Sequence, residues 1–240
     1  MTDQPHHPAN QPASQSGDKL DGKSGRQLSL GLALPESWAA EDFLPAEGNH
    51  AALGWLARWP DWPGGILLLH GPPGSGKTHL AHIWCGQAGA GLAEGGMLTE
   101  AAVDDLARAA LALDNAEAAD PVALFHLINL MRERGHGLLL TAAKPPAAWN
   151  VALADLASRL KALPLAEIHE PDDELLAAVM VKLFADRQLA VGEGVIAYLL
   201  PRMERSFHAA RLWVARLDAA ALAEQRAVTI GLVRRLLEAE

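Results

Sequence analysis

The feature that most constrains this chain is a glycine-rich segment between two strongly patterned stretches: Gly71, Pro72, Pro73, Gly74, Ser75, Gly76, Lys77 and Thr78. It fits the pattern G-x-x-x-x-G-K-[ST] at every fixed position. The residues before it, Ile66–His70, form a short apolar run typical of a buried parallel strand. The residues after it, Thr78–Gly86, have a helical pattern. A glycine turn that arose by chance would not need a strand before it and a helix after it. The sequence therefore predicts a strand–loop–helix unit that binds phosphate.

The chemistry of such a loop follows from its backbone. Glycines allow the chain to curl until successive N–H groups point at phosphate oxygens. The following helix adds the partial positive charge of its N-terminus. We expect all eight residues, 71–78, to bind a nucleotide, with Lys77 on the β- and γ-phosphates and the Thr78 hydroxyl on Mg²⁺.

A site of this kind also needs an acid at the tip of a neighbouring strand. Asp114, which follows the apolar Leu111–Leu113, is the preferred Mg²⁺ candidate; its rival, Asp104–Asp105, has helical surroundings. The next residue, Asn115, stands where a hydrolytic enzyme often has a carboxylate. An amide cannot accept a proton from water, so intrinsic hydrolysis is expected to be slow. Glu117 is either a substitute for that acid or a solvated loop residue.

The rest of the chain divides in two. A helix with Asn49 as its N-cap is predicted for residues 50–58, and strand and helix patterns alternate through Pro121–Arg134 and Leu138–Thr141. After about Pro171 the strand patterns disappear, and the segments predicted as helices are Asp172–Arg187, Gly192–Met203, Ser206–Ala223 and Ile230–Glu240. We therefore predict an α/β P-loop NTPase domain with a parallel sheet at 35–170, followed by a small all-α lid domain at 171–240.

The N-terminal residues have a different composition. Residues 1–26 are polar and rich in Pro, Gln, Ser and Gly, so they cannot bury enough apolar surface to fold and are predicted to be a disordered tail. Leu alternates with other residues from Gln27 to Pro35, which predicts an extended segment. No hairpin partner is evident for it. That leaves open a peptide, 27–34, that docks on another molecule.

Composition excludes several classes of function. The formal charge is −9, so the summed field repels DNA. Cys85 is the only cysteine, which excludes a disulfide within the chain and a metal site built from cysteines. The sequence has no secretory signal pattern and no apolar stretch of membrane-spanning length. We expect a cytoplasmic protein that makes no membrane contact.

Taken together, the motifs resemble the DnaA-related AAA+ family, and within it the Hda proteins. The resemblance spans about 27–240 and rests on GPPGSGKTHLAHIW, LDN, LLLTAAKPP, DLASRL and the closing helices. It implies an AAA+ domain with a lid, ADP or ATP with Mg²⁺ as ligands, and a homo-oligomer as one form of assembly. It also implies two partners, the DNA polymerase III sliding clamp and DnaA, and negative regulation of replication initiation.

The resemblance assigns roles to two further sets of residues. Arg159 matches the arginine finger, which stabilises the γ-phosphate charge on a neighbouring subunit; the alternative is an exposed arginine paired with Asp155 one turn earlier. The N-terminal peptide matches the clamp-binding motif, in which a glutamine anchors the chain and leucines fill an apolar pocket. Its residues are Gln27, Leu28, Ser29, Leu30 and Leu32.

Two positions depart from the family pattern. His208 aligns with the arginine that the lid normally offers to the nucleotide, with Arg205 and Arg211 one turn to either side, so all three remain candidates. After Thr141, near the sensor position, Lys144 replaces an acidic residue. We therefore expect weak sensing of the γ-phosphate and ADP as the working ligand.

The resemblance thus favours a regulator that binds the clamp and stimulates ATP hydrolysis by DnaA. No helix-turn-helix pattern follows the lid, and direct sequence-specific DNA binding is not expected. One alternative is an autonomous AAA+ ATPase that serves as a helicase loader or a helper in DNA transactions. Another is an adaptor whose nucleotide is only structural.

Overall fold

The computed structural model describes residues 38–239, with only the backbone of Glu41. The predicted disordered tail (1–26) and clamp-binding peptide (27–34) lie outside these residues, so both stay predictions. None of the described helices is long and apolar enough to cross a lipid bilayer.

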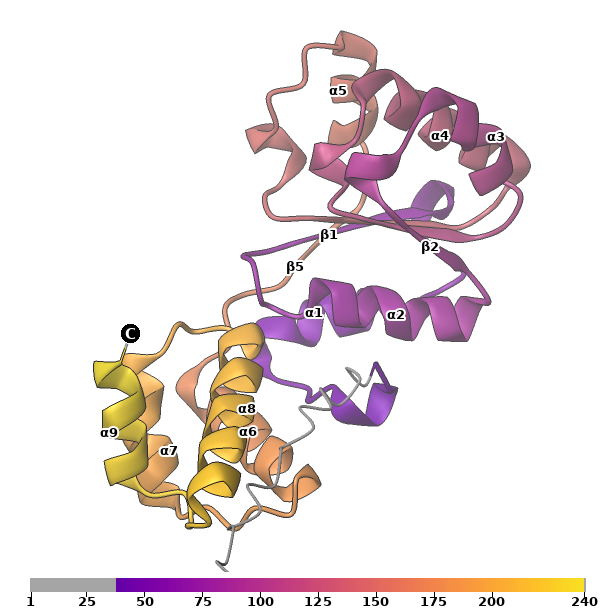
Figure 1. Cartoon of the computed structure of the whole chain (residues 1–240). Coiled ribbons are helices and arrows are strands. Elements are labelled where there is room, and N and C mark those ends of the chain that lie inside the picture. The colour runs from indigo at the N-terminus through magenta and orange to yellow at the C-terminus, as the bar shows by residue number, and fades with distance from the viewer. Residues whose placement is uncertain (1–37, 240) are drawn as a thin grey trace, which may run out of the picture. The chain divides into compact units, whose positions relative to one another are not determined.

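A five-stranded parallel sheet forms the centre of the α/β part (Figure 1). Its order is β2-β3-β4-β1-β5. The strands are β1 (Ile66–His70), β2 (Gly91–Glu94), β3 (Leu111–Asp114), β4 (Leu138–Ala142) and β5 (Leu165–Glu167). Every residue of β1, β3 and β4 is buried, because helices cover both faces of a sheet of this kind.

The helices lie on opposite sides of the sheet (Figure 1). On one side, α1 (Glu47–Ala57) and α2 (Lys77–Ala88) pack around the buried Trp62 and Trp84. On the other side, a second apolar core joins the sheet to α3 (Val103–Leu106), α4 (Pro121–Arg134) and α5 (Ala154–Lys161). The predicted fold class, a parallel α/β sheet followed by an all-α lid, is confirmed.

The C-terminal part is helical and has its own core. It consists of α6 (Asp173–Asp186), α7 (Glu193–Leu199), α8 (Phe207–Glu224) and α9 (Ile230–Glu238). Side chains cap three of these helices, because the oxygens of Asp172, Ser206 and Thr229 accept backbone N–H groups of the first turn. Phe184, Trp213 and other apolar side chains of α6–α9 form one cluster.

Short 3₁₀ turns lie between the helices and strands or next to their ends. They are η1 (Ala40–Asp42), η2 (Pro63–Gly65), η3 (Gly95–Met97), η4 (Glu100–Ala102), η5 (Ala116–Ala118), η6 (Pro146–Ala148) and η7 (Leu200–Arg202). The last one replaces the end of the helix predicted for 192–203, where Pro201 cannot donate a helical hydrogen bond.

One local prediction is wrong. Asn49 is not the N-cap of α1, which begins two residues earlier, at Glu47 after the N-cap Ala46. The Asn49 side chain instead reaches back and accepts the backbone N–H of Ala46 at 2.9 Å, while its amide donates to the Leu44 carbonyl at 3.0 Å. Asn49 therefore stabilises the helix start from inside its first turn.

Candidate functional site

The glycine-rich loop, predicted to bind phosphate, leaves β1 at His70 and enters α2 at Lys77. Gly74 and Gly76 have φ values of 73° and 99°, a left-handed conformation that L side chains rarely adopt. The Lys77 ammonium is buried inside the loop and donates to the carbonyls of Gly71 and Pro72, each at 2.8 Å. A cation therefore lies among the backbone groups of the loop, where an anion can be neutralised.

Burial sets the electrostatics of this ammonium. Desolvation lowers the pKa of Lys77, and the nearby carboxylates of Asp114 and Glu117 oppose that shift. Because bound phosphates would add negative charge beside it, a nucleotide would also favour the protonated ammonium.

A hydrogen-bonded group of oxygens lies beside the loop. The Thr78 hydroxyl donates to Asp114 Oδ2 at 2.8 Å, and the Thr141 hydroxyl donates to Asp114 Oδ1. The Asn115 backbone N–H donates in turn to Thr141 Oγ1 at 3.0 Å. Residues from α2, β3 and β4 thus meet at the carboxyl ends of neighbouring strands.

This donor set fits Mg²⁺, which prefers hydroxyl, carboxylate, water and phosphate oxygens. Thr78 and Asp114 would hold the ion with the help of phosphate oxygens. Within residues 38–239 no group of three or more His, Cys, Asp or Glu side chains is arranged to hold a metal ion. The rival pair does not reach the loop, since Asp104 bonds to Arg134 and Asp105 to Arg108 at the surface.

The two residues after Asp114 have defined partners. The Asn115 amide donates to Glu94 Oε1 at 2.9 Å, which turns its side chain toward β2. Glu117 Oε1 accepts the backbone N–H of Ala143, directly after β4, at 2.6 Å. Glu117 is therefore a fixed carboxylate of the site and not only a solvated loop residue.

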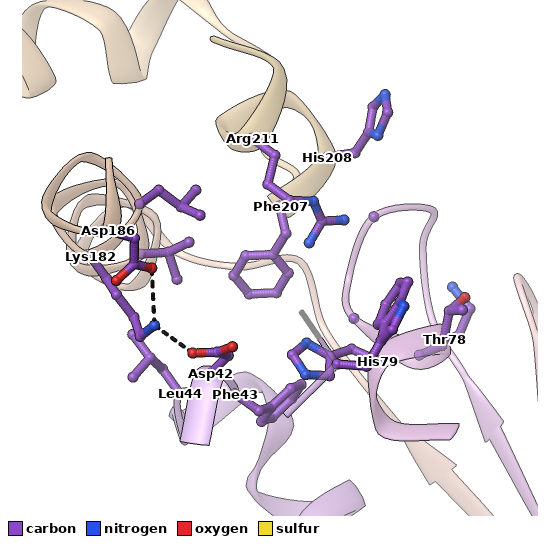
Figure 2. A pocket seen from close by; sticks show the side chains of 16 residues that line it. Asp42, Phe43, Leu44, Thr78, His79, Lys182, Asp186, Phe207, His208 and Arg211 are labelled. Atoms are coloured by element: carbon purple, nitrogen blue, oxygen red, sulfur yellow. Dashed lines mark hydrogen bonds and ion pairs between the residues drawn. The ribbon is translucent and has the colours of Figure 1, made fainter. Parts of the chain in front are cut away.

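A cavity of about 540 Å³ extends from the loop to the lid (Figure 2). Its volume lies in the range of small-molecule sites. The loop contributes Gly74, Gly76, Lys77 and Thr78. The segment before α1 contributes Trp38, Asp42, Phe43 and Leu44. The remaining lining residues are His79 of α2, Val179, Lys182, Leu183 and Asp186 of α6, and Phe207, His208 and Arg211 of α8.

The start of α8 packs directly on the loop. The Phe207 backbone N–H donates to the Gly74 carbonyl at 3.1 Å. A Cβ atom added at Gly74 would lie 2.4 Å from the Ser206 Cβ. The contact therefore requires glycine at this position for two reasons, the left-handed backbone and the close approach of the lid.

The lid candidates differ in their placement. His208 and Arg211 both line the cavity, with His208 exposed and Arg211 half-buried (Figure 2). Arg205 does not line it, and its guanidinium pairs with Asp173 at 3.0 Å. The structure brings His208 and Arg211 to the site and leaves Arg205 outside.

An aromatic wall that sequence reasoning missed joins the segment before α1 to α2. The Trp38 ring stacks on His82 with centroids 4.3 Å apart, and the Phe43 ring meets His79 edge-on at 5.4 Å. His79 Nε2 lies 3.1 Å from the Ala39 carbonyl oxygen. Desolvation lowers the pKa of His79, and the bond to Ala39 opposes the shift. Nothing in the linear pattern links Trp38–Phe43 to α2.

Arg159 lies away from the cavity, in the last turn of α5. The neighbouring Leu156 and Leu160 are buried and fix the helix on the sheet, while Arg159 is exposed. Among the described residues no ion pair or hydrogen bond holds its guanidinium, so the alternative pairing with Asp155 is not formed in this structure.

The lid matches a known family. Residues 172–237 match the family model described as Hda, lid domain. This range begins at the N-cap of α6 and ends within α9.

Solved structures match most of the chain in fold. Domain III of the replication initiation protein DnaA from Thermotoga maritima has a TM-score of 0.72 at 18% identity, covering 84% of this chain and 95% of that one. AMPPCP-bound DnaA from Aquifex aeolicus has a TM-score of 0.63 at 18% identity, covering 82% of this chain and 68% of that one.

A third structure shares the fold. The RuvB Holliday junction branch migration motor from Thermotoga maritima has a TM-score of 0.67 at 16% identity, covering 85% of this chain and 72% of that one. The AAA+ fold is common to these structures, and the lid match is specific to Hda. Residues 172–237 thus match the Hda lid family, and the chain as a whole shares the fold of DnaA domain III.

Proposed function

We propose that this protein is a regulator that binds ADP or ATP and stimulates ATP hydrolysis by DnaA, which prevents re-initiation of chromosomal replication. The observation that supports it most is an exposed arginine, Arg159, which has no ion pair or hydrogen bond to any side chain among residues 38–239 and lies on an AAA+ domain whose lid matches Hda. An arginine finger must remain available to a second molecule, and Arg159 meets that condition.

The nucleotide would occupy the cavity between the loop and the lid. Its phosphates would bind the backbone of Gly71–Thr78 and the Lys77 ammonium, and Thr78 with Asp114 would hold Mg²⁺, which neutralises phosphate charge. Arg211 and His208 would approach the nucleotide from α8.

Two features of the site are consistent with ADP as the bound nucleotide and with slow intrinsic hydrolysis of ATP. Lys144 replaces the acid of the sensor motif, and the Asn115 amide is bonded to Glu94.

The partners follow from the family and from the N-terminal peptide. Gln27–Leu32 would bind the DNA polymerase III sliding clamp, which would bring the protein to the nucleoid on replicating DNA. Arg159 would then approach ATP bound to DnaA. The planar guanidinium can form two parallel bonds to phosphate oxygens and would stabilise charge in the transition state.

The deciding experiment follows radiolabelled ATP on DnaA with clamp-loaded DNA present. Arg159→Ala should bind ADP and the clamp as the wild type does but lose the stimulation. The rate of ATP hydrolysis by DnaA should fall by about 10³-fold or more, which is the contribution of an arginine finger supplied by a second molecule. Arg159→Lys should recover little of it. Arg108→Ala removes an arginine that pairs with Asp105 at the surface, and as the matched control it should stimulate normally. Full stimulation by Arg159→Ala would refute the proposal.

One observation favours a second candidate, an autonomous AAA+ ATPase. Glu117 is held by the Ala143 backbone and acts on Lys77 electrostatically, so a carboxylate does lie near the phosphate site. Under this alternative the protein alone hydrolyses ATP, and Glu117→Gln abolishes that activity. The regulator proposal expects little turnover in either protein without DnaA.

A further inference from the structure

The side chain of Ser75, inside the glycine-rich loop, is buried and has no protein partner. Its exposed fraction is 1%, and no group among residues 38–239 forms a hydrogen bond with its Oγ. A buried hydroxyl without a hydrogen bond destabilises a fold, so most such groups bond either to protein or to ordered water. The loop pattern leaves this position open to any residue, and alanine would avoid that cost. The hydroxyl of Ser75 therefore needs a physical explanation.

A small cavity lies against Ser75. Its volume is about 20 Å³, which is room for one water molecule and far too little for a nucleotide base. One wall is the start of α1, with Gly48. Another wall is the segment 168–172, here called the connector, which joins β5 to α6 of the lid. The cavity thus lies where the glycine-rich loop, the sheet and the lid meet.

The connector provides further hydrogen-bonding groups in this wall. The carbonyl oxygens of His169 and Glu170 lie 3.9 and 3.7 Å from the place that a Cβ on Gly48 would take. No N–H or O–H group of the described residues donates a hydrogen bond to either oxygen. A buried water molecule usually forms about three hydrogen bonds. Ser75 and the two carbonyls would supply that number.

These groups suit water better than a cation. The Ser75 hydroxyl can donate a hydrogen bond as well as accept one, and a metal ion would use only its lone pairs. In the part of the chain that the structure describes, no cluster of three or more His, Cys, Asp or Glu side chains could hold a metal. Water can also join polar groups that are too far apart to bond directly.

We propose that one buried water molecule joins the Ser75 hydroxyl to the connector. Ser75 donates its hydroxyl hydrogen to the water, and the water donates its two hydrogens to the carbonyl oxygens of His169 and Glu170. This water fixes the glycine-rich loop to the segment from which the lid begins. Ser75 is then a positioning residue, because it holds the loop in its phosphate-binding shape before a ligand arrives. The site itself rests on packing alone, and its effect on ligands rests on the proposed nucleotide binding.

The direct test is a crystal structure of the full chain at a resolution that shows ordered solvent. The wild type should have a water molecule about 2.5–3.0 Å from Ser75 Oγ and from the carbonyl oxygens of the connector. Ser75→Ala should lack it. A dry cavity in the wild type, or a protein group bonded directly to Ser75 Oγ, would overturn the proposal.

Thermal unfolding without nucleotide tests the same point by the sign of the effect. If water satisfies the hydroxyl, Ser75→Ala loses a hydrogen bond, and the melting temperature should fall by about 2–4 °C. If the cavity is dry, the variant loses an unpaired buried hydroxyl, and the melting temperature should rise. Ser158→Ala, at an exposed position of α5, is the matched control and should not lower it. A rise in Ser75→Ala would overturn the water site.

Calorimetric titrations with pyrophosphate and ADP test the positioning role. Pyrophosphate contacts only the loop, so Ser75→Ala should weaken both ligands by the same factor, about 3–10-fold. Ser158→Ala should bind both as the wild type does. Unchanged affinities in Ser75→Ala would overturn the positioning role. A wild type that binds neither ligand would overturn the proposed nucleotide binding, and the crystal structure and the melting temperatures would still decide whether the water is there.

Discussion

The Thr78 hydroxyl and the Asp114 carboxylate are hydrogen bonded at 2.8 Å, although 36 positions separate them in the sequence. Thr78 is the last residue of the glycine-rich loop, and Asp114 ends β3. Their contact brings together the two protein oxygens that we expect to hold a nucleotide-bound Mg²⁺.

Asp114→Asn should therefore uncouple nucleotide binding from Mg²⁺. The amide oxygen can accept from one of the two hydroxyls, Thr78 or Thr141, and the amide N–H can donate to the other, so the fold should persist, but the charge that attracts the cation is lost. Adding Mg²⁺ should raise the nucleotide affinity of this variant about 10–100-fold less than it raises that of the wild type. Mutations of residues that position a metal ion lower metal affinity by about this factor. Titrations with Mg²⁺ and with EDTA measure it. Asp104→Asn should behave as the wild type, and an equal loss there would reject the assignment of Asp114.

The clamp-binding peptide makes a separate prediction. Replacing Gln27, Leu28 and Leu30 with Ala should lower clamp affinity by about 100-fold or more, because such anchors dominate small interfaces. The melting temperature and ADP affinity should not change. Surface plasmon resonance on immobilised clamp measures the effect, with Leu20→Ala as the control. Clamp affinity within about twofold of wild type would show that the motif is not the docking peptide.

The contact between lid and loop predicts opposite effects for two glycines. Gly74→Ala places a Cβ against Ser206 in a left-handed backbone, which costs about 1–2 kcal/mol for the backbone alone. It should lower the melting temperature and weaken nucleotide binding. Gly86→Ala lies in exposed helix with no atom within 4 Å of the added Cβ, and should stabilise the protein by about 0.5–1 kcal/mol. Thermal unfolding compares the two, and equal effects would contradict the close lid contact.

His70 predicts a dependence of stability on pH. Burial lowers the pKa of its imidazole, Glu167 opposes the shift, and His169 and Lys77 add to it. The unfolded chain titrates near the usual value of about 6.5 and binds the proton first. The folded state therefore keeps its full stability above about pH 6.5 and loses it as the pH falls toward the lowered native pKa.

His70→Gln removes that titration. Its melting temperature should fall less than the wild type's between about pH 7.5 and pH 5.5. The exposed His126 of α4 provides the control, and His126→Gln should keep the wild-type difference. An equally steep fall in His70→Gln would exclude His70 as a source of the acid sensitivity.

The local parts of the fold could be predicted because their signals are local. Ile66–His70, the glycine loop and Pro121–Arg134 each combine an uninterrupted pattern with a clear boundary residue, and the structure has the two elements at these bounds. The strands β2 and β5 were missed. Both are short edge strands with mostly exposed residues, so neither has an apolar pattern. Their pairing with β3 and β1 defines them.

The sequence by itself determined the strand–loop–helix unit, because its glycines, Lys77 and Thr78 all lie within eight consecutive residues between two clear patterns. It also indicated Asp114, since a strand's carboxyl end brings its next residue to that edge of the sheet. Tertiary structure alone decided the far end of the cavity. The contact of Asp42 with Lys182 and the choice of Arg211 and His208 over Arg205 depend on how α6 and α8 pack against the segment before α1. No local pattern encodes that packing, because it arises from side chains far apart in the chain that share one cavity.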